Sequence, residues 1–206
     1  MQSVMQHTFG VAPSIEIPRS SFDRSSGFKC TFDAGNLVPV FVDEALPGDT
    51  FTLNPTMFAR LNTPIYPIMD NMFLDVHFFA IPLRLVWDNF RKFCGEQLNP
   101  GDSISFTTPI STAPSTTGYA NESLQDYLGL PTKVPDYEHS ALFTRAYNLV
   151  YREWYRDQNL IDSPVVDTDD GPDDPADYVI RKRGKRADYF TTALTAPHDR
   201  DWETRL

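Results

Sequence analysis

Residues 140–160 read SALFTRAYNLVYREWYRDQNL, and this stretch decides more about the fold than any other part of the chain. Its apolar side chains recur at steps of four, three and four residues, which places them on one face of an α-helix. The sequence therefore predicts a helix over 140–160, with Ser140 as N-cap and Asn159 just past the last turn. The residues that define the apolar face are Phe143, Tyr147, Val150 and Trp154.

The opposite face of this helix is polar. Arg145, Asn148 and Arg152 fall mostly on that side, where water would solvate them. The large rings of the apolar face need a receiving surface, and we expect Trp154 to be buried against it. If that ring is fully enclosed, its replacement by alanine should cost ~3–5 kcal/mol of stability.

The composition favours one β-rich domain. The chain has 206 residues, of which 13% are aromatic and 17 are proline, as is typical of strands joined by irregular loops. Its formal net charge of −10 argues against a protein whose whole surface binds nucleic acid, although a local basic patch still could.

Several segments before the helix alternate apolar and polar residues with the period of a β-strand. The strongest is residues 70–81, where one face is wholly apolar and the other carries Asp75 and His77. Such a strand belongs inside a sheet that packs on a second layer. Shorter strands are predicted at residues 28–32, 37–44 and 51–53.

The connections between these elements carry weaker signals. Residues 1–27 are polar and lack periodicity, so we expect an extended N-terminal arm that a partner surface must order. A short helix is predicted over 83–94, and a helical turn over 121–129 with Asn121 as its cap. Residues 96–118 are rich in Pro, Gly, Ser and Thr and predict a long surface loop.

Two cysteines, Cys30 and Cys94, lie far apart and form no CxxC pair, so they predict neither a disulfide framework nor a zinc site. We expect two buried or half-buried free thiols. The N-terminal residues lack the regions of a signal peptide, and no stretch approaches the ~20 apolar residues of a membrane helix. The sequence thus predicts a soluble protein, made in a reducing compartment and without a membrane partner.

An acidic stretch follows the predicted helix and precedes a basic one, together spanning residues 161–186. Clustered carboxylates suit Ca²⁺, but their spacing does not match an EF-hand loop, so we predict no metal site. The simplest interpretation is a solvated loop kept rigid by Pro172 and Pro175, and a second is a surface that meets the cations of a neighbouring subunit. The residues assigned to that surface are Asp167, Asp169, Asp170, Asp173 and Asp174.

The basic run that follows has three possible roles: contact with phosphates, pairing with the acidic loop, or a solvated turn. The run contains no aromatic residue for base stacking, so any nucleic-acid contact should be made to the backbone and be independent of sequence. The residues assigned to nucleic-acid or inter-subunit contact are Arg181, Lys182, Arg183, Lys185 and Arg186.

Enzyme signatures are missing from the sequence. It contains no GxSxG, HExxH, Walker or GxGxxG motif, so no catalytic residue and no cofactor is predicted. Asp75 and His77 share one strand face, where a structural pair is the better interpretation than an acid–base pair. Two alternatives stay open: a glycan-binding β-sandwich with an exposed aromatic platform, and a β-sandwich hydrolase with convergent carboxylates.

Longer strings of the sequence carry a family resemblance. They are RSSFDRSSGFKCTFDAGNLVPVFVDEALPGDTF, ARLNTPIYPIMDNMFLDVHFFAIPLRLVWDNFRKFCGE, RAYNLVYREWYRDQNL, VVDTDDGPDDPADY and RKRGKRADYFTTAL. With these strings, which span about residues 19–194, the chain resembles the major capsid protein of microviruses, small icosahedral phages with single-stranded DNA. The gokushovirus-like branch is the most similar.

The resemblance implies a mainly β subunit with an antiparallel jelly-roll sandwich, incomplete here, and with helical and long-loop excursions. It implies an arm at residues 1–27 and a partial jelly-roll domain at 28–206, in a T=1 shell of about 60 copies. It also implies single-stranded DNA and other virion proteins as partners, a place in the virion, and assembly in the host bacterial cytoplasm. Family members are much longer, and residues 197–206 differ from their usual continuation.

Overall fold

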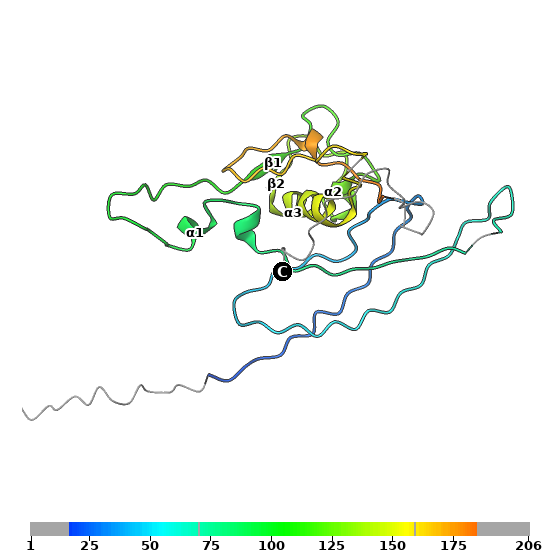
Figure 1. Ribbon diagram of the computed structural model, residues 1–206, viewed down its shortest axis with the longest axis horizontal. Coiled ribbons are helices and arrows are strands. Elements are labelled where there is room, and N and C mark those ends of the chain that lie inside the picture. The colour runs from blue at the N-terminus through cyan, green and yellow to red at the C-terminus, as the bar shows by residue number, and fades with distance from the viewer. Residues whose placement is uncertain (1–16, 70, 159, 185–206) are drawn as a thin grey trace, which may run out of the picture.

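The structure, a computed structural model, describes residues 17–69, 71–158 and 160–184 (Figure 1). Within these residues, all helices and strands lie between Leu83 and Asp177. In chain order they are the 3-10 turn η1 (Leu83–Leu85), α1 (Phe90–Phe93), β1 (Ile110–Thr112), α2 (Leu124–Tyr127), β2 (Glu138–Ser140), α3 (Leu142–Val150), the π-helical turn η2 (Tyr151–Tyr155) and the 3-10 turn η3 (Pro175–Asp177).

The two strands form an antiparallel sheet in which Ile110 lies opposite Ser140 and Ser111 opposite His139. The acidic stretch continues this sheet, because Asp173 pairs with Ser111 in a parallel bridge and its N–H donates to the Ile110 carbonyl at 2.8 Å. The sequence predicts a surface loop over residues 96–118, but β1 begins inside it. Ser111, in the middle of β1, is buried beside the acidic stretch, and its hydroxyl donates to the Asp173 carbonyl at 3.4 Å. The pattern of Pro, Gly, Ser and Thr does not reveal this contact.

The core lies where α2 and α3 meet the C-terminal part of the described chain, close to the sheet (Figure 1). Leu124, Tyr147 and Tyr178 form its buried centre. The Tyr147 hydroxyl donates to the Leu37 carbonyl and accepts from the Arg181 N–H, both at 2.9 Å. One tyrosine therefore ties the early and late parts of the chain to α3. Leu37, Leu128 and Ile180 pack around this centre.

The predicted helix over residues 140–160 is confirmed, but it is shorter and changes type. It runs as α3 to Val150, continues as the π-helical turn η2 and ends before Arg156, whose backbone is extended. Ser140 is not the N-cap, which is Ala141, although the Ser140 hydroxyl accepts from the Leu142 N–H at 3.4 Å.

The predicted faces of this helix are partly wrong. Arg145 and Asn148 are fully buried, whereas Trp154 is 70% exposed. The π-helical turn explains the position of Trp154, because bonds from residue i to i+5 shift the phase of the side chains. The Arg156 N–H, for example, donates to the Tyr151 carbonyl at 2.9 Å. The predicted cost of ~3–5 kcal/mol for replacing Trp154 therefore does not apply, since it assumed an enclosed ring.

The segments predicted as strands at 28–32, 37–44, 51–53 and 70–81 contain no strand among residues 28–69 and 71–81. They run as long extended connections outside the core (Figure 1). A strand requires a neighbour that supplies ladder hydrogen bonds, and these segments make few such contacts within the described chain. Many of their large apolar side chains are exposed, among them Phe28, Phe41, Phe51, Met72 and Phe73.

Two shorter predictions also need correction. The helix over 83–94 is interrupted between η1 and α1, because the Asp88 N–H leaves the helical pattern to donate to the Thr168 carbonyl at 2.8 Å. The turn over 121–129 is confirmed as α2, but its cap is Ser123, whose hydroxyl accepts from the Asp126 N–H. Cys30 and Cys94 are free, as predicted, and exposed rather than buried.

Replacing Gly118 with alanine should destabilise the protein strongly. Gly118 has a φ of 64°, and a Cβ atom there would lie 2.4 Å from the backbone nitrogen of Val134. Left-handed strain alone costs about 1–3 kcal/mol, and the clash with backbone adds to it. The urea midpoint of the variant measures the loss. Gly129→Ala is the matched control, since its φ is 85° but no atom lies within 4 Å of the added Cβ; equal losses at both sites would contradict the steric argument.

Candidate assembly and nucleic-acid interface

The basic run lies against the C-terminal end of the long helix. The Gly184 N–H donates to the Tyr155 carbonyl at 3.1 Å, and the Arg183 N–H to the Gly35 carbonyl at 2.8 Å. Lys182 forms an antiparallel bridge with Asn36, and its side chain is exposed. The structure thus fixes the positions of Arg181, Lys182 and Arg183, while Lys185 and Arg186 lie outside the described residues.

Two arginines of this run stack on tyrosines of η2. The guanidinium carbon of Arg183 lies 5.7 Å from the centre of the Tyr155 ring, and that of Arg181 lies 5.8 Å from the centre of Tyr151. Arg183 also forms an ion pair with Asp75 at 2.6 Å. Arg183 therefore does not pair with the acidic loop. The carboxylate that binds it belongs to Asp75, in the extended segment 71–81.

Alternate residues of that extended segment meet the helix end one after another. Asp75 binds Arg183, the Nδ1 atom of His77 lies 2.7 Å from the Tyr155 hydroxyl, and the rings of Phe79 and Trp154 are 5.5 Å apart. Side chains two residues apart share one face of an extended chain, so the predicted alternation is what creates this row of contacts. We name His77, Phe79, Trp154, Tyr155 and Arg183 the aromatic–arginine patch.

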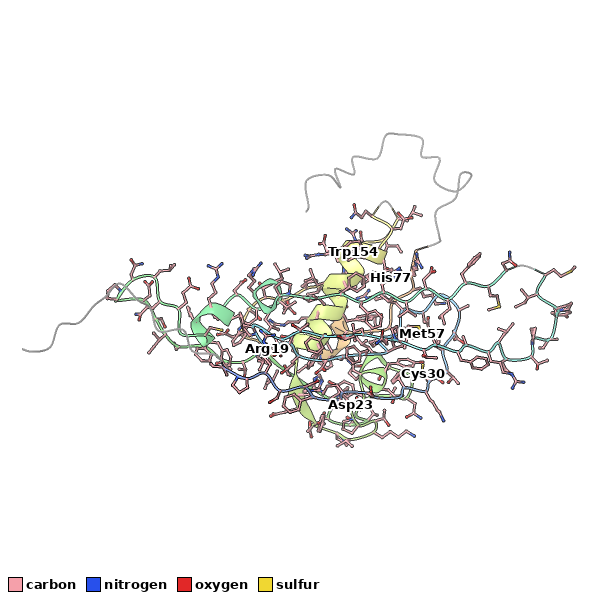
Figure 2. All side chains as sticks on the ribbon, turned by 90° about the horizontal axis from the view of Figure 1, so that it is seen from below. Arg19, Asp23, Cys30, Met57, His77 and Trp154 are labelled. Carbon is pink, nitrogen blue, oxygen red and sulfur yellow. The ribbon has the colours of Figure 1, made fainter. Side chains whose placement is uncertain are left out.

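The patch is accessible. Trp154 is 70% exposed and Phe79 is 36% exposed. His77 and Trp154 lie close together on one side of the molecule, where the helix end projects (Figure 2). A cavity of about 340 Å³ adjoins Trp154 and Phe79. Its other lining residues are Ala80, Ile81, Leu85, Leu149, Val150, Arg152 and Glu153.

The contacts of the patch bear on the two alternative functions. Asp75 and His77 each have a structural partner, Arg183 and Tyr155, so they offer no catalytic pair of the kind a hydrolase requires. An aromatic platform for glycans would need exposed rings, and Trp87 is only 2% exposed whereas Trp154 is open. The glycan interpretation is therefore left with a single tryptophan in the described chain.

The acidic loop is not merely solvated, because a buried arginine of α3 binds its carboxylates. Arg145 is 0% exposed. Its Nε and Nη2 atoms donate to the two carboxylate oxygens of Asp173 at 2.7 and 2.5 Å, and Nη2 also reaches Asp169 at 3.2 Å. Nη1 donates to the carbonyls of Val86 at 3.0 Å and Asp169 at 2.8 Å. All five donors of the guanidinium are thus satisfied.

Asp173 is the most enclosed carboxylate of the loop. Its carboxylate accepts hydrogen bonds from Arg145 and from the Tyr178 hydroxyl. Burial, and to a lesser extent this hydrogen bond, raises the pKa of Tyr178 above its usual value. Burial likewise raises the pKa of Tyr147 to about 12. Both phenols therefore remain neutral donors at physiological pH, which suits their structural hydrogen bonds.

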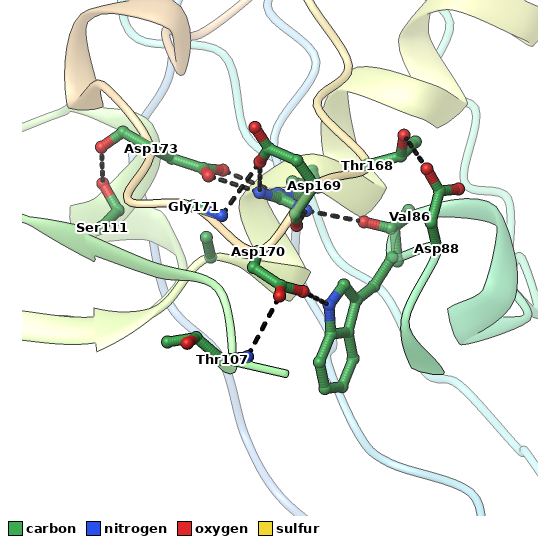
Figure 3. Close-up of polar contacts among 12 residues, drawn as sticks. Val86, Asp88, Thr107, Ser111, Thr168, Asp169, Asp170, Gly171 and Asp173 are labelled. Atoms are coloured by element: carbon green, nitrogen blue, oxygen red, sulfur yellow. Dashed lines mark hydrogen bonds and ion pairs between the residues drawn. The ribbon is translucent and has the colours of Figure 1, made fainter. Parts of the chain in front are cut away.

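Asp170 joins the loop to the segment around Trp87 (Figure 3). Its carboxylate accepts from the Trp87 indole N–H and the Asn89 amide, both at 2.8 Å, and from the Thr107 N–H at 3.1 Å. These hydrogen bonds hold the pKa of Asp170 below its usual value, and the one from Trp87 has the largest effect. A second link is the hydrogen bond of 2.9 Å from the Thr168 hydroxyl to Asp88.

The two remaining acidic candidates play smaller parts. Asp174 caps η3, where its carboxylate accepts from the Ala176 N–H at 2.9 Å. Asp167 is half-buried, and desolvation together with the charge of Asp173 raises its pKa. Four of the five predicted inter-subunit aspartates, Asp169, Asp170, Asp173 and Asp174, thus already accept hydrogen bonds within the chain. Their role between subunits stays a prediction.

Acid should weaken this loop through Asp170. Because the pKa of Asp170 is lower in the folded state than the ~3.9 of an unfolded chain, the carboxylate stabilises the fold above that value. This stabilisation is lost as the pH falls through the lowered pKa, while Asp167, with its raised pKa, acts in the opposite direction. Urea midpoints between pH 2.5 and 6 should fall less steeply with acid for Asp170→Asn than for the parent. Identical pH profiles would contradict the assignment.

The described residues contain no group of three or more potential metal ligands. In the acidic loop, the carboxylates of Asp173 and Asp170 bind Arg145 and Trp87 and do not converge on a shared site. Among the helices that the structure describes, none is long and apolar enough to cross a membrane.

Comparison with known proteins assigns these features to a family. Residues 11–204 match the model of the family described as "Capsid protein (F protein)", so the match extends beyond the 19–194 span of the resemblance and into residues 197–204. The chain is 50% identical over 192 residues to capsid protein VP1 of Bdellovibrio phage phiMH2K and 46% identical over 217 residues to that of Chlamydia phage 1. Capsid protein VP1 of Spiroplasma virus 4 is 31% identical over 204 residues.

These alignments cover 93%, 94% and 93% of this chain but only 36% of each relative. The chain therefore spans about a third of the length of the curated relatives it matches. All three relatives are named as structural proteins rather than enzymes, in agreement with the missing catalytic motifs. A family match over residues 11–204 shows that this chain belongs to the capsid protein (F protein) family of phages, as the resemblance to microvirus capsid proteins predicts.

Proposed function

We propose that this chain forms part of the structural subunit of an icosahedral bacteriophage capsid, which assembles with copies of itself and encloses single-stranded DNA. The observation that carries the proposal is the extended part of the chain, described over residues 17–69 and 71–81, where many large apolar side chains are exposed. Monomeric soluble proteins rarely expose this many large apolar side chains, so these residues need a partner surface. Membership of a capsid family indicates what that partner is.

We propose further that the extended segments become strands of an antiparallel jelly-roll. Residues 71–81 have one apolar face, made by Met72, Leu74, Val76, Phe78 and Ala80, which is what a strand packed between two layers requires. The ring centres of Phe41 and Phe78 lie 6.4 Å apart, so two of the segments already lie close together at this point. Strands contributed from outside these residues, by the same longer polypeptide or by a neighbour, would supply the missing ladder partners.

The assembled shell we propose has T=1 symmetry and about 60 copies, the number that icosahedral symmetry gives when every subunit has the same surroundings. Its subunits would bind other virion proteins and be assembled in the cytoplasm of the host bacterium. Arg181, Lys182, Arg183, Lys185 and Arg186 would then offset charge on the genome or on a neighbouring subunit.

Expression of the whole open reading frame that contains these residues tests the proposal. We expect closed particles in electron micrographs, a particle mass of about 60 subunits, and single-stranded DNA that resists nuclease until the particles are opened. Monomers or open sheets at micromolar concentration would contradict the structural role. Particles of another symmetry would contradict the T=1 arrangement alone.

Charge removal tests the basic run separately. Substituting glutamine for all five cations of residues 181–186 should lower the DNA content of purified particles, because fewer phosphates are neutralised. The measurement is the ratio of nucleic acid to protein per particle at fixed salt. Unchanged packaging together with unchanged assembly would show that these cations serve neither role.

A further inference from the structure

We propose that the aromatic–arginine patch is a base-stacking site for single-stranded nucleic acid, with Trp154 as its main platform and the cations beside it as phosphate ligands. This inference rests on the proposed function, in which the subunit encloses single-stranded DNA, and it names the residues that contact the strand. The basic run alone predicts backbone contacts only, because no aromatic residue interrupts it.

The fold supplies the missing aromatic residues. The basic run meets Tyr155 directly, through the hydrogen bond of Gly184 and the stacked guanidinium of Arg183. Tyr155 lies 6.0 Å from the Phe79 ring and 5.9 Å from the His77 ring, and Phe79 lies 5.5 Å from Trp154. Four rings from two segments that are distant in the sequence thus lie next to the basic run and form one surface with it.

The exposure of Trp154 is what a stacking platform requires. Trp154 lies in the π-helical turn, which directs its indole toward solvent, and 70% of the residue is exposed. Trp87, by contrast, is buried. π-Helical turns are often found at functional sites, and an exposed tryptophan held on other rings binds a planar base at little entropic cost. The bases of single strands offer their faces for stacking, whereas a duplex hides them.

The charges around the patch favour an anionic partner. Residues 151–157 and 181–184 together carry five cations and two carboxylates, and Asp75 adds a third carboxylate. Asp75 holds Arg183 and Glu153 holds Arg152, but no ion pair among the described residues involves Arg156, Arg181 or Lys182. An acidic surface of a second copy would also pair with these cations, but a single strand offers both phosphates for the cations and base faces for the exposed rings.

The test measures the affinity of the purified full chain for fluorescently labelled (dT)20 by anisotropy, at several salt concentrations. Trp154→Ala should weaken binding about tenfold, and Trp154→Phe should recover most of the loss because phenylalanine also stacks. Lys182→Gln should lower the slope of log K against log salt by about 0.7, the value for one lost phosphate contact on a single strand. The matched controls are Phe58→Ala, an exposed ring outside the patch, and Arg60→Gln, an exposed cation elsewhere.

Three outcomes would overturn the inference. They are equal affinity of Trp154→Ala and parent, equal losses in Trp154→Ala and Phe58→Ala, and a Trp154→Ala variant that changes only the oligomeric state in sedimentation. The last result would assign the patch to a second copy of the chain. Failure of the proposed function looks different, because whole-gene particles would then not form or would hold no nuclease-resistant DNA, whichever residue stands at position 154.

Discussion

Replacing Arg145 with alanine is expected to lower the free energy of unfolding by about 3–5 kcal/mol, one of the two largest effects we foresee. The guanidinium is wholly enclosed and holds Asp173, Asp169 and the Val86 carbonyl together. Removing it leaves the carboxylate of Asp173, whose side chain is 1% exposed, as an unpaired charge in the interior. Breaking one partner of a buried ion pair is costly for that reason, even where the intact pair contributes little by itself.

Urea unfolding of parent and variant measures this effect. The control is Arg152→Ala on the same helix, whose ion pair with Glu153 lies at the surface, with side chains 36% and 32% exposed. Such a pair is worth only about 0–1 kcal/mol. Asp173→Asn should approach the loss of Arg145→Ala, since it also leaves one charge of the pair without its partner. A loss below about 1 kcal/mol for Arg145→Ala would mean that water reaches the guanidinium and the enclosed network does not exist in solution.

Arg145 shows what a single sequence can and cannot predict. Helical periodicity gives the helix correctly as far as Val150, but of its apolar stripe only Tyr147 is buried, whereas Phe143 and Val150 are half-buried. It assigns Arg145 and Asn148 to the solvent, because a pattern of apolar residues treats any polar residue as exposed. The acidic partner of Arg145 lies 28 residues further along the chain, and no local spacing connects the two.

The same reasoning applies to the candidate interface. The alternation in residues 71–81 correctly places Asp75, His77 and Phe79 on one face, but alternation does not say what that face meets. Its partners, Trp154, Tyr155 and Arg183, come from segments 75 or more residues away. The segments predicted as strands are unpaired in the structure for a related reason. An alternating pattern indicates that a segment can pair, whereas a strand forms only beside a neighbour that supplies hydrogen bonds.

Replacing Trp87 with alanine is the second change with a large expected effect, about 3–5 kcal/mol. The indole is 2% exposed, and its ring lies 5.6 Å from Phe93, 6.1 Å from Phe106 and 6.3 Å from Phe90. Alanine would leave a cavity among these rings and would also remove the hydrogen bond to Asp170. Because that bond joins the acidic loop to the segment before α1, packing and polar contacts would be lost together.

Two further substitutions separate these contributions. Trp87→Phe keeps most of the ring but has no N–H, so it should cost about 1–3 kcal/mol, the range for leaving a polar partner unsatisfied. Trp154→Ala removes the same side chain from an exposed position and should change stability by less than about 0.5 kcal/mol. Urea midpoints of the three variants should therefore rank Trp87→Ala lowest, Trp87→Phe next, and Trp154→Ala nearest the parent. If Trp154→Ala proved as unstable as Trp87→Ala, the helix would keep its apolar stripe through residue 154, the indole would be buried, and the aromatic–arginine patch would have no platform to offer.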